Sequence, residues 1–119
     1  AEFTQTVPVG EQWIVRAVRA RFVAGAAAST REPAIVVDDG AGNVTVQSVA
    51  AFAITALQTR DLSYFHGAAN LQLGPVQSNP WMLDAVLPAG FIIRSITQGI
   101  QPADQWSAIT LLIERFIAA

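Results

Sequence analysis

Apolar and polar side chains alternate in short runs along most of the chain, a pattern that predicts β-strands with one buried and one exposed face. The first clear run covers residues 12–23, where Trp13, Val18 and Phe22 are interleaved with arginines. Further runs predict strands at residues 34–37, 44–46, 52–57, 61–66, 81–86, 91–99 and 106–117. Gly-Pro and Asn-Pro pairs break the stretch from residue 67 to residue 80, which is therefore predicted to be a loop.

The sharpest local signal is a turn at residues 38–43, Asp-Asp-Gly-Ala-Gly-Asn, between two β-branched runs. Asp, Asn and Gly readily adopt the backbone conformations of tight reversals, so the segment predicts a β-hairpin. The same oxygen-rich turn could present ligands to calcium, but it lacks the spaced ligands and the distal Glu of an EF-hand loop. A plain hairpin turn is the better interpretation.

Helix competes with strand only where alanine is dense, at residues 24–29 and 49–56. The first segment contains Gly25 and has no amphipathic stripe, and β-branched residues flank the second, so short helices there are an alternative. No helical run of the length that links parallel strands separates the predicted strands. The sequence predicts one all-β domain over residues 1–119, an antiparallel β-sandwich or jelly roll of about eight strands.

Two similar tetrapeptides precede two of the predicted strands, Val-Pro-Val-Gly at residues 7–10 and Leu-Pro-Ala-Gly at residues 87–90. Proline fixes φ just before a strand begins, and glycine permits the turn into it. The two segments are predicted to be equivalent strand starts, although a repeat this short also arises by chance.

The last predicted strand is apolar on both faces, with Ile109, Leu111 and Ile113 on one side and Leu112 and Phe116 on the other. Such a strand lies in the centre of a sheet or under a neighbouring subunit. Hydrophobic residues make up 52% of the chain and charged residues 13%, which gives more apolar surface than one small core needs. We therefore expect a homo-oligomer or a larger assembly.

The charge distribution argues against nucleic acid as a partner. The net charge is −2, and the seven basic residues are arginines spread along the chain, whereas nucleic-acid binders gather a basic excess on one face. The absence of cysteine excludes disulfides, cysteine-based zinc sites and thiol nucleophiles. The longest nearly apolar stretch, residues 49–57, is far shorter than the roughly 20 residues of a membrane-spanning helix. Neither nucleic acid nor a membrane is an expected partner.

One group of residues has the composition of a catalytic triad, namely Asp61, Ser63 and His66. In a strand, Asp61 and Ser63 point to one face and His66 to the other, so the imidazole cannot reach the serine hydroxyl. His66 is also the only histidine, which leaves a zinc site dependent on carboxylates. We expect no catalytic activity, no metal and no cofactor.

The three tryptophans, Trp13, Trp81 and Trp106, stand at or near the starts of predicted strands. Tryptophan in such a place usually seals the end of a sandwich core. The alternative is that Trp81, which follows Asn79 at the end of the longest predicted loop, is an exposed anchor for a protein or a sugar.

The N-terminal residues 1–6 are polar apart from Phe3 and precede a proline turn. We expect them to form an extended arm that orders when it docks on a partner. The predicted partner-binding residues are therefore Phe3 and Gln5 in this arm, and Asn79 and Trp81 at the end of the loop.

Several of these segments together resemble small structural proteins of tailed-bacteriophage virions. They are the Val-Pro-x-Gly turn before Trp13, the Arg-Glu-Pro segment at residues 31–33 that leads into the hairpin, and the Leu-Pro-Ala-Gly strand followed by Asp-Gln-Trp-Ser at residues 104–107. The motifs are turns and strand starts, and they transfer no functional residues. The resemblance implies a β-sandwich or jelly-roll head decoration (cement) protein.

Such a protein docks on an assembled capsid, often as a trimer, and stabilises the joints between capsomers. The resemblance thus implies other copies of this chain and the major capsid protein as partners. It also implies synthesis in the host cytoplasm and a final place on the capsid surface of the virion. The alternative is a carbohydrate- or receptor-binding β-sandwich, for example from a phage tail, which would need an exposed aromatic pair over a polar groove.

Overall fold

The computed structural model describes residues 1–81 and 85–117, and the regular structure in this part of the chain is entirely β-strand. The strands are β1 (Thr4–Thr6), β2 (Glu11–Val23), β3 (Glu32–Asp38), β4 (Val44–Val49), β5 (Thr59–Phe65), β6 (Leu71–Leu73), β7 (Val76–Pro80), β8 (Ile92–Gln98) and β9 (Gln105–Ile117). The predicted all-β class is confirmed.

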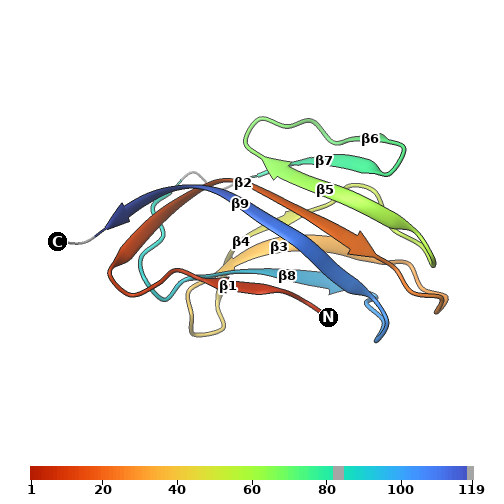
Figure 1. Cartoon of the computed structure of the whole chain (residues 1–119), viewed down its shortest axis with the longest axis horizontal. Coiled ribbons are helices and arrows are strands. Elements are labelled where there is room, and N and C mark those ends of the chain that lie inside the picture. Colours follow the sequence, from red (N-terminus) through yellow and green to blue (C-terminus); the bar gives the residue numbers. More distant parts are fainter. Residues whose placement is uncertain (82–84, 118–119) are drawn as a thin grey trace.

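The strands form two sheets that pack face to face as a sandwich (Figure 1). One sheet has the order β1-β8-β3-β4, and the other has the order β6-β7-β5-β2-β9. The pairs within both sheets are antiparallel except β5 and β7, which run parallel from Asp61 opposite Val76 to Phe65 opposite Pro80. The predicted sandwich is therefore confirmed, with one parallel pair in an otherwise antiparallel structure.

The inward side chains of both sheets form one core. Its largest fully buried members include Trp81, Phe22 and Tyr64, and Trp13 and Trp106 are only 7% exposed. Burying side chains of this size stabilises the fold by roughly 1.5–3 kcal/mol each. The prediction that the tryptophans seal the core is confirmed, and the polar tip of Trp81 is satisfied because its Nε1 donates to the carbonyl of Val15 at 3.0 Å.

The segment at residues 52–57 differs from its predicted secondary structure because a tertiary contact overrides local preference. Residues 52–57 form a loop in which Ile54 alone pairs with Arg31, through two backbone hydrogen bonds of 2.8 Å. Ile54 is fully buried, and the N–H of Leu57 donates to the carbonyl of Gly25 at 3.0 Å. The loop is therefore held by one inserted side chain and isolated hydrogen bonds and not by a ladder. The alanine-rich segments 24–29 and 49–56 form no helix.

The predicted loop at residues 67–80 contains two strands, β6 and β7, joined by a turn at Gly74 and Pro75. The pattern of apolar residues does not predict β7, because its two inward positions hold the polar residues Gln77 and Asn79, and both are buried. The strand predicted at residues 81–86 is not formed at residues 81, 85 and 86. Residues 82–84 lie outside the described part of the chain.

The two similar tetrapeptides are indeed equivalent strand starts, since each forms a turn shortly before β2 or β8. They also bind each other. The N–H of Val7 donates to the carbonyl of Phe91 at 2.8 Å, and the N–H of Gly90 donates to the carbonyl of Val7 at 3.0 Å. These two bonds extend the β1–β8 ladder within one sheet. The contact between the sheets is made by Trp13 of β2 and Leu87, just before β8, which exchange backbone hydrogen bonds of 3.0 and 2.7 Å.

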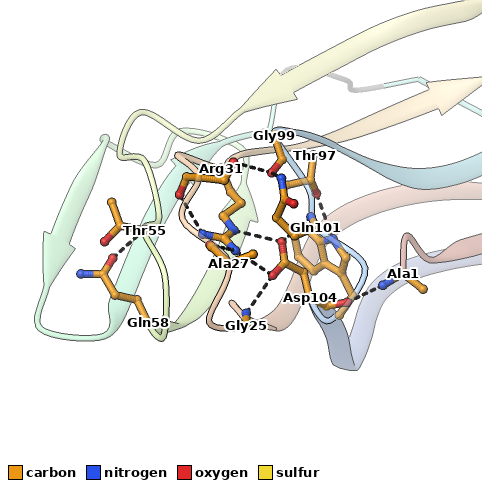
Figure 2. A network of polar contacts seen from close by, with 12 residues as sticks. Ala1, Gly25, Ala27, Arg31, Thr55, Gln58, Thr97, Gly99, Gln101 and Asp104 are labelled. Atoms are coloured by element: carbon orange, nitrogen blue, oxygen red, sulfur yellow. Dashed lines mark hydrogen bonds and ion pairs between the residues drawn. The ribbon is translucent and has the colours of Figure 1, made fainter.

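A buried ion pair joins the loops at the other end (Figure 2). Arg31 and Asp104 both have fully buried side chains, and Arg31 Nε lies 3.0 Å from Asp104 Oδ2. The guanidinium also donates to the carbonyls of Ser29 and Ala27, at 2.7 and 2.9 Å. Figure 2 shows these groups converging from two loops that are far apart in the sequence. All three guanidinium nitrogens thus have acceptors, as a buried cation requires.

Asp104 directly precedes β9. Both oxygens of its carboxylate accept hydrogen bonds, from the Arg31 guanidinium and from the backbone. It accepts hydrogen bonds from the backbone N–H groups of Gly25 and Gln101, both at 2.8 Å. Its carbonyl accepts a hydrogen bond from the amino group of Ala1. We refer to these contacts as the Arg31–Asp104 network; it fixes the N-terminus and the start of β9 at one point.

The two loops of this network approach so closely that a side chain would not fit between them. A Cβ atom on Gly99 would lie 2.2 Å from the carbonyl oxygen of Thr30, and one on Gly25 would lie 2.8 Å from the Cβ of Ala103. Glycine is therefore required at both positions by the packing.

Because of this network, the free energy of unfolding is expected to depend on pH in the acid range. Burial alone raises the pKa of Asp104, but the hydrogen bonds from Arg31, Gly25 and Gln101 outweigh it and lower that pKa to about 2 from a usual 3.8. A carboxyl whose pKa is lowered in the folded state contributes its full stabilisation above the unfolded-state pKa. That contribution is lost as the pH falls from about 4 towards 2.

We predict that an NMR titration of the Asp104 carboxyl carbon has its midpoint near pH 2. The corresponding contribution to the free energy of unfolding is on the order of 2 kcal/mol at neutral pH. Urea unfolding at a series of pH values measures its loss. A midpoint near 3.8, the ordinary value, would show that the ion pair does not stabilise the folded state.

Candidate functional site

Two of the four predicted partner-binding residues, Asn79 and Trp81, lie in the interior. Their exposed fractions are 0% and 1%. Asn79 is on β7, which pairs with β6 and β5. Its side chain is fully buried and accepts a hydrogen bond from the N–H of Ala51 at 3.3 Å. The prediction of an exposed anchor on a loop is wrong, because the segment is a strand and its alternate residues are buried.

The predicted free arm at residues 1–6 is also wrong, because this segment is part of the sandwich. Thr4–Thr6 forms β1 and pairs with β8. The Glu2 carboxylate accepts hydrogen bonds from the N–H of Thr97 at 2.6 Å and from Trp106 Nε1 at 3.1 Å. The ring of Phe3 packs edge-on against Trp106, with 5.4 Å between centroids. Gln5 remains exposed at the rim.

The final strand is the most unusual exposed feature of the chain. β9 is an edge strand of its sheet, paired with β2 on one side only, so the central position that the sequence allowed is wrong. Its side chains nevertheless stay apolar where they are open to solvent, with exposed fractions of 39% for Ile109, 64% for Leu112, 47% for Phe116 and 68% for Ile117.

A groove runs between β9 and β1, the neighbouring edges of the two sheets. Its volume is about 400 Å³ and its lining comes from both sheets: Phe3, Thr4, Gln5, Trp13, Ile109, Leu111 and Ile113. Figure 1 shows β1 passing beneath β9 on this side of the sandwich. We call β9 and this groove together the open edge. Phe3 and Gln5, two of the predicted partner-binding residues, both belong to it.

The open edge has few of the features that protect edge strands from pairing. Natural edges are usually short or carry Lys, Pro or a bulge. β9 has thirteen residues with no Lys or Pro, and at about 3.4 Å per residue it spans roughly 44 Å, close to the longest dimension of the molecule, 49 Å. Its irregularity at Ala108, where φ is 50°, lies near its start. Beyond it β9 carries no further extra residue. The second irregularity of the β2–β9 pair is a bulge of β2 at Arg16, opposite Leu112 and Ile113, so the outer edge of β9 stays open to pairing.

The charged residues of β9 are already neutralised within the chain. Glu114 forms an ion pair of 2.9 Å with Arg16, and Arg115 lies 3.5 Å from Glu11. A partner that covered the open edge would therefore not bury an uncompensated charge, which is the most costly element of a protein interface.

The residues with the composition of a triad do not assemble. The Asp61 carboxylate binds Arg21 at 2.9 Å and raises the pKa of that guanidinium. Ser63 lies between Arg19 and Ser78 on neighbouring strands, and His66 follows the end of β5 in an exposed turn. No group of three or more potential metal ligands occurs among the described residues.

The predicted hairpin at residues 38–43 is confirmed, and its carboxylates bind the turn, with Asp38 also forming an ion pair of 3.2 Å with Arg94. Asp38 accepts hydrogen bonds from the N–H groups of Gly40 and Gly42, at 2.7 and 3.2 Å. Hydrogen bonds from the Asn43 side chain and from the N–H of Ala41 lower the pKa of Asp39. These interactions account for the acidic residues without a bound cation.

Comparison with known proteins finds no matching family model, no similar curated protein and no similar solved structure. Within the described residues, no helix is long and apolar enough to cross a membrane. The functional argument therefore depends on the geometry of the open edge.

The open edge gives a test of how firmly β1 is held. Replacing Phe3 with Ala should lower the free energy of unfolding by about 2 kcal/mol, roughly half the loss for a fully buried phenylalanine, because the ring packs on Trp106. Replacing its neighbour Gln5 with Ala should change it by less than about 0.5 kcal/mol. Equal effects in urea unfolding would mean that β1 is not anchored through Phe3.

Proposed function

We propose that this protein is a non-catalytic assembly module that binds protein surfaces through its open edge. The observation that supports this most directly is the character of β9, a long edge strand with exposed apolar side chains at Leu112, Phe116 and Ile117. A small soluble monomer rarely leaves such a strand uncovered, because its free N–H and C=O groups and apolar side chains pair readily with other chains.

The size of the edge suits a protein partner. A standard interface buries about 800 Å² on each side, roughly an eighth of the 6198 Å² that this chain exposes. Interfaces of this size reach very different affinities, so many copies acting together can hold a large assembly even when each contact is modest.

Within this class we propose a structural role in a phage virion, as the sequence resemblance implies. The protein would bind the major capsid protein on the capsid surface as a head decoration protein, after synthesis in the host cytoplasm. The apolar open edge supports this proposal, because many copies that dock on a shell need a preformed binding surface and no catalytic or metal-binding groups.

The competing role, carbohydrate or receptor binding, would need an exposed aromatic pair over a polar groove. The tryptophans are at most 7% exposed. Phe3 and Trp13 line the groove together with Thr4, Gln5 and three aliphatic side chains, but Trp13 is too buried to form an exposed aromatic pair with Phe3. This arrangement favours protein over sugar. A glycan array, on which no binding is expected, distinguishes the two.

We predict that Leu112→Glu weakens binding to undecorated heads of the virus that encodes the chain by about tenfold or more, since one buried leucine contributes at least ~1.5 kcal/mol. Leu73→Glu is the matched control, because Leu73 is similarly exposed, at 70% against 64%, but lies on β6 at the opposite edge of the same sheet. Co-sedimentation of purified protein with the heads measures both.

Decorated heads should also retain their DNA to a higher temperature than undecorated heads. Equal weakening by the two variants would remove the open edge as the docking surface. A failure of the wild-type chain to bind heads, together with binding on the glycan array, would replace the proposed function by the receptor-binding role.

A further inference from the structure

The lengths of the edge strands restrict what can pair with β9. Among the described residues the sheet edges are β1 and β6 with three residues each, β4 with six, and β9 with thirteen. The strand of this chain that matches β9 along its length is the β9 of a second copy. We propose that two copies pair β9 with β9 in antiparallel orientation about a two-fold axis at Leu112, which joins their five-stranded sheets into one.

This inference rests on the proposed function, because it takes the open edge to be a docking surface and names its first occupant. A two-fold interface uses the same patch on both subunits. Such an interface leaves no unmatched half of β9, whereas pairing with β1, β4 or β6 would leave most of its hydrogen-bonding groups open.

The side chains select the register. Directly opposite residues of antiparallel strands share a face, so the two-fold axis passes midway between one residue and its copy. An axis at Glu114 would oppose two carboxylates, and an axis at Ile113 would place Glu114 against Leu112. An axis at Leu112 opposes Leu112 with itself, Leu111 with Ile113, and Thr110 with Glu114, which avoids both conflicts. Arg115 then lies opposite Ile109, and its charge stays paired with Glu11 of its own chain.

The same register supplies a charge partner for Arg19. Arg19, on β2, lies directly opposite Thr110 of β9, on the outer face of the sheet. Within the part of the chain that the structure describes, its guanidinium makes no ion pair. Pairing at Leu112 places Glu114 of the second copy beyond Thr110, two strand spacings or about 10 Å from the Arg19 backbone. Because Thr110 is short, the arginine and glutamate side chains can meet above it.

Symmetry forms this contact twice, once on each side of the axis. Glu114 keeps its own ion pair with Arg16, so the three side chains form a network that crosses the interface. On the inner face, Leu111 and Ile113 of each copy meet, and the groove beside Phe3 and Gln5 continues from one copy into the other.

The register is testable by disulfide trapping, because the chain has no cysteine. Directly paired residues have Cα atoms about 4.5–5.5 Å apart, within the range that a disulfide spans. We expect Leu112→Cys to form a covalent dimer under mild oxidation. Thr110→Cys alone should form little, since Thr110 and its own copy are offset by about four residues or 14 Å. Leu73→Cys, on the other edge, should form none beyond random collision.

Sedimentation equilibrium tests the association itself. The wild-type chain should form dimers at micromolar concentration. Leu112→Glu, which opposes two carboxylates at the axis, should weaken dimerisation by about tenfold or more, while Leu73→Glu leaves it unchanged. Arg19→Glu should weaken it by about threefold or more, since two exposed ion pairs are lost. Circular dichroism and urea unfolding verify that each variant is folded.

A monomer at all concentrations, or preferential trapping at Thr110 or Leu73, would overturn the pairing. The trimer that the resemblance implies would also overturn it, because a ring of three cannot use a two-fold contact alone. Binding of monomers to virus heads would reject this inference and leave the proposed function intact. Dimers that ignore the heads would support the pairing and reject the decoration role.

Discussion

The buried ion pair between Arg31 and Asp104 is the constraint on which both sides of the open edge depend. Asp104 holds the start of β9 through its carboxylate and the N-terminus through its carbonyl. Removing one partner would leave an uncompensated charge in a fully buried place, a loss of about 3–5 kcal/mol. The loss would not stay local, because β1 begins at Thr4 and β9 at Gln105, within a few residues of the pair.

The edge that we propose as the docking surface is therefore pre-organised. Glu2 binds Ser95, Thr97 and Trp106, and Phe3 packs on Trp106, so β1 is ordered before any partner arrives. A partner then loses little affinity to the ordering of this segment, unlike one that must capture a free arm. Rigidity at the rim and exposed apolar groups along β9 are complementary properties: the first fixes the geometry and the second supplies the free energy.

The sequence predicts the class of fold, but of the four predicted partner-binding residues only Phe3 and Gln5 lie at the open edge, and the errors have identifiable physical causes. Alternation predicts β2, β5 and β8, because one face of each meets the core, whereas runs of apolar and β-branched residues predict β3, β4 and β9. It misses β7, whose inward residues are the polar Gln77 and Asn79, and β1, whose order depends on contacts with residues about a hundred positions away. The sequence predicts the two apolar faces of β9. Its place at the edge depends on the order of the strands in the sheet, which the local pattern of residues does not determine.

The proposed pairing of two β9 strands would also account for how such an exposed edge is compatible with a particle of defined size. In a two-fold contact the same strand of both copies forms the interface, so the free edge of β9 is occupied once two copies have associated. The edges of the joined sheet are then two copies of β6, each of three residues, and short edge strands are poor templates for further growth. A long apolar strand that would promote open-ended aggregation in a heterologous contact thus becomes, in an isologous one, a means of limiting the assembly to two copies. In the proposed pair the groove beside Phe3 and Gln5, which is the other part of the open edge, is left for a larger partner.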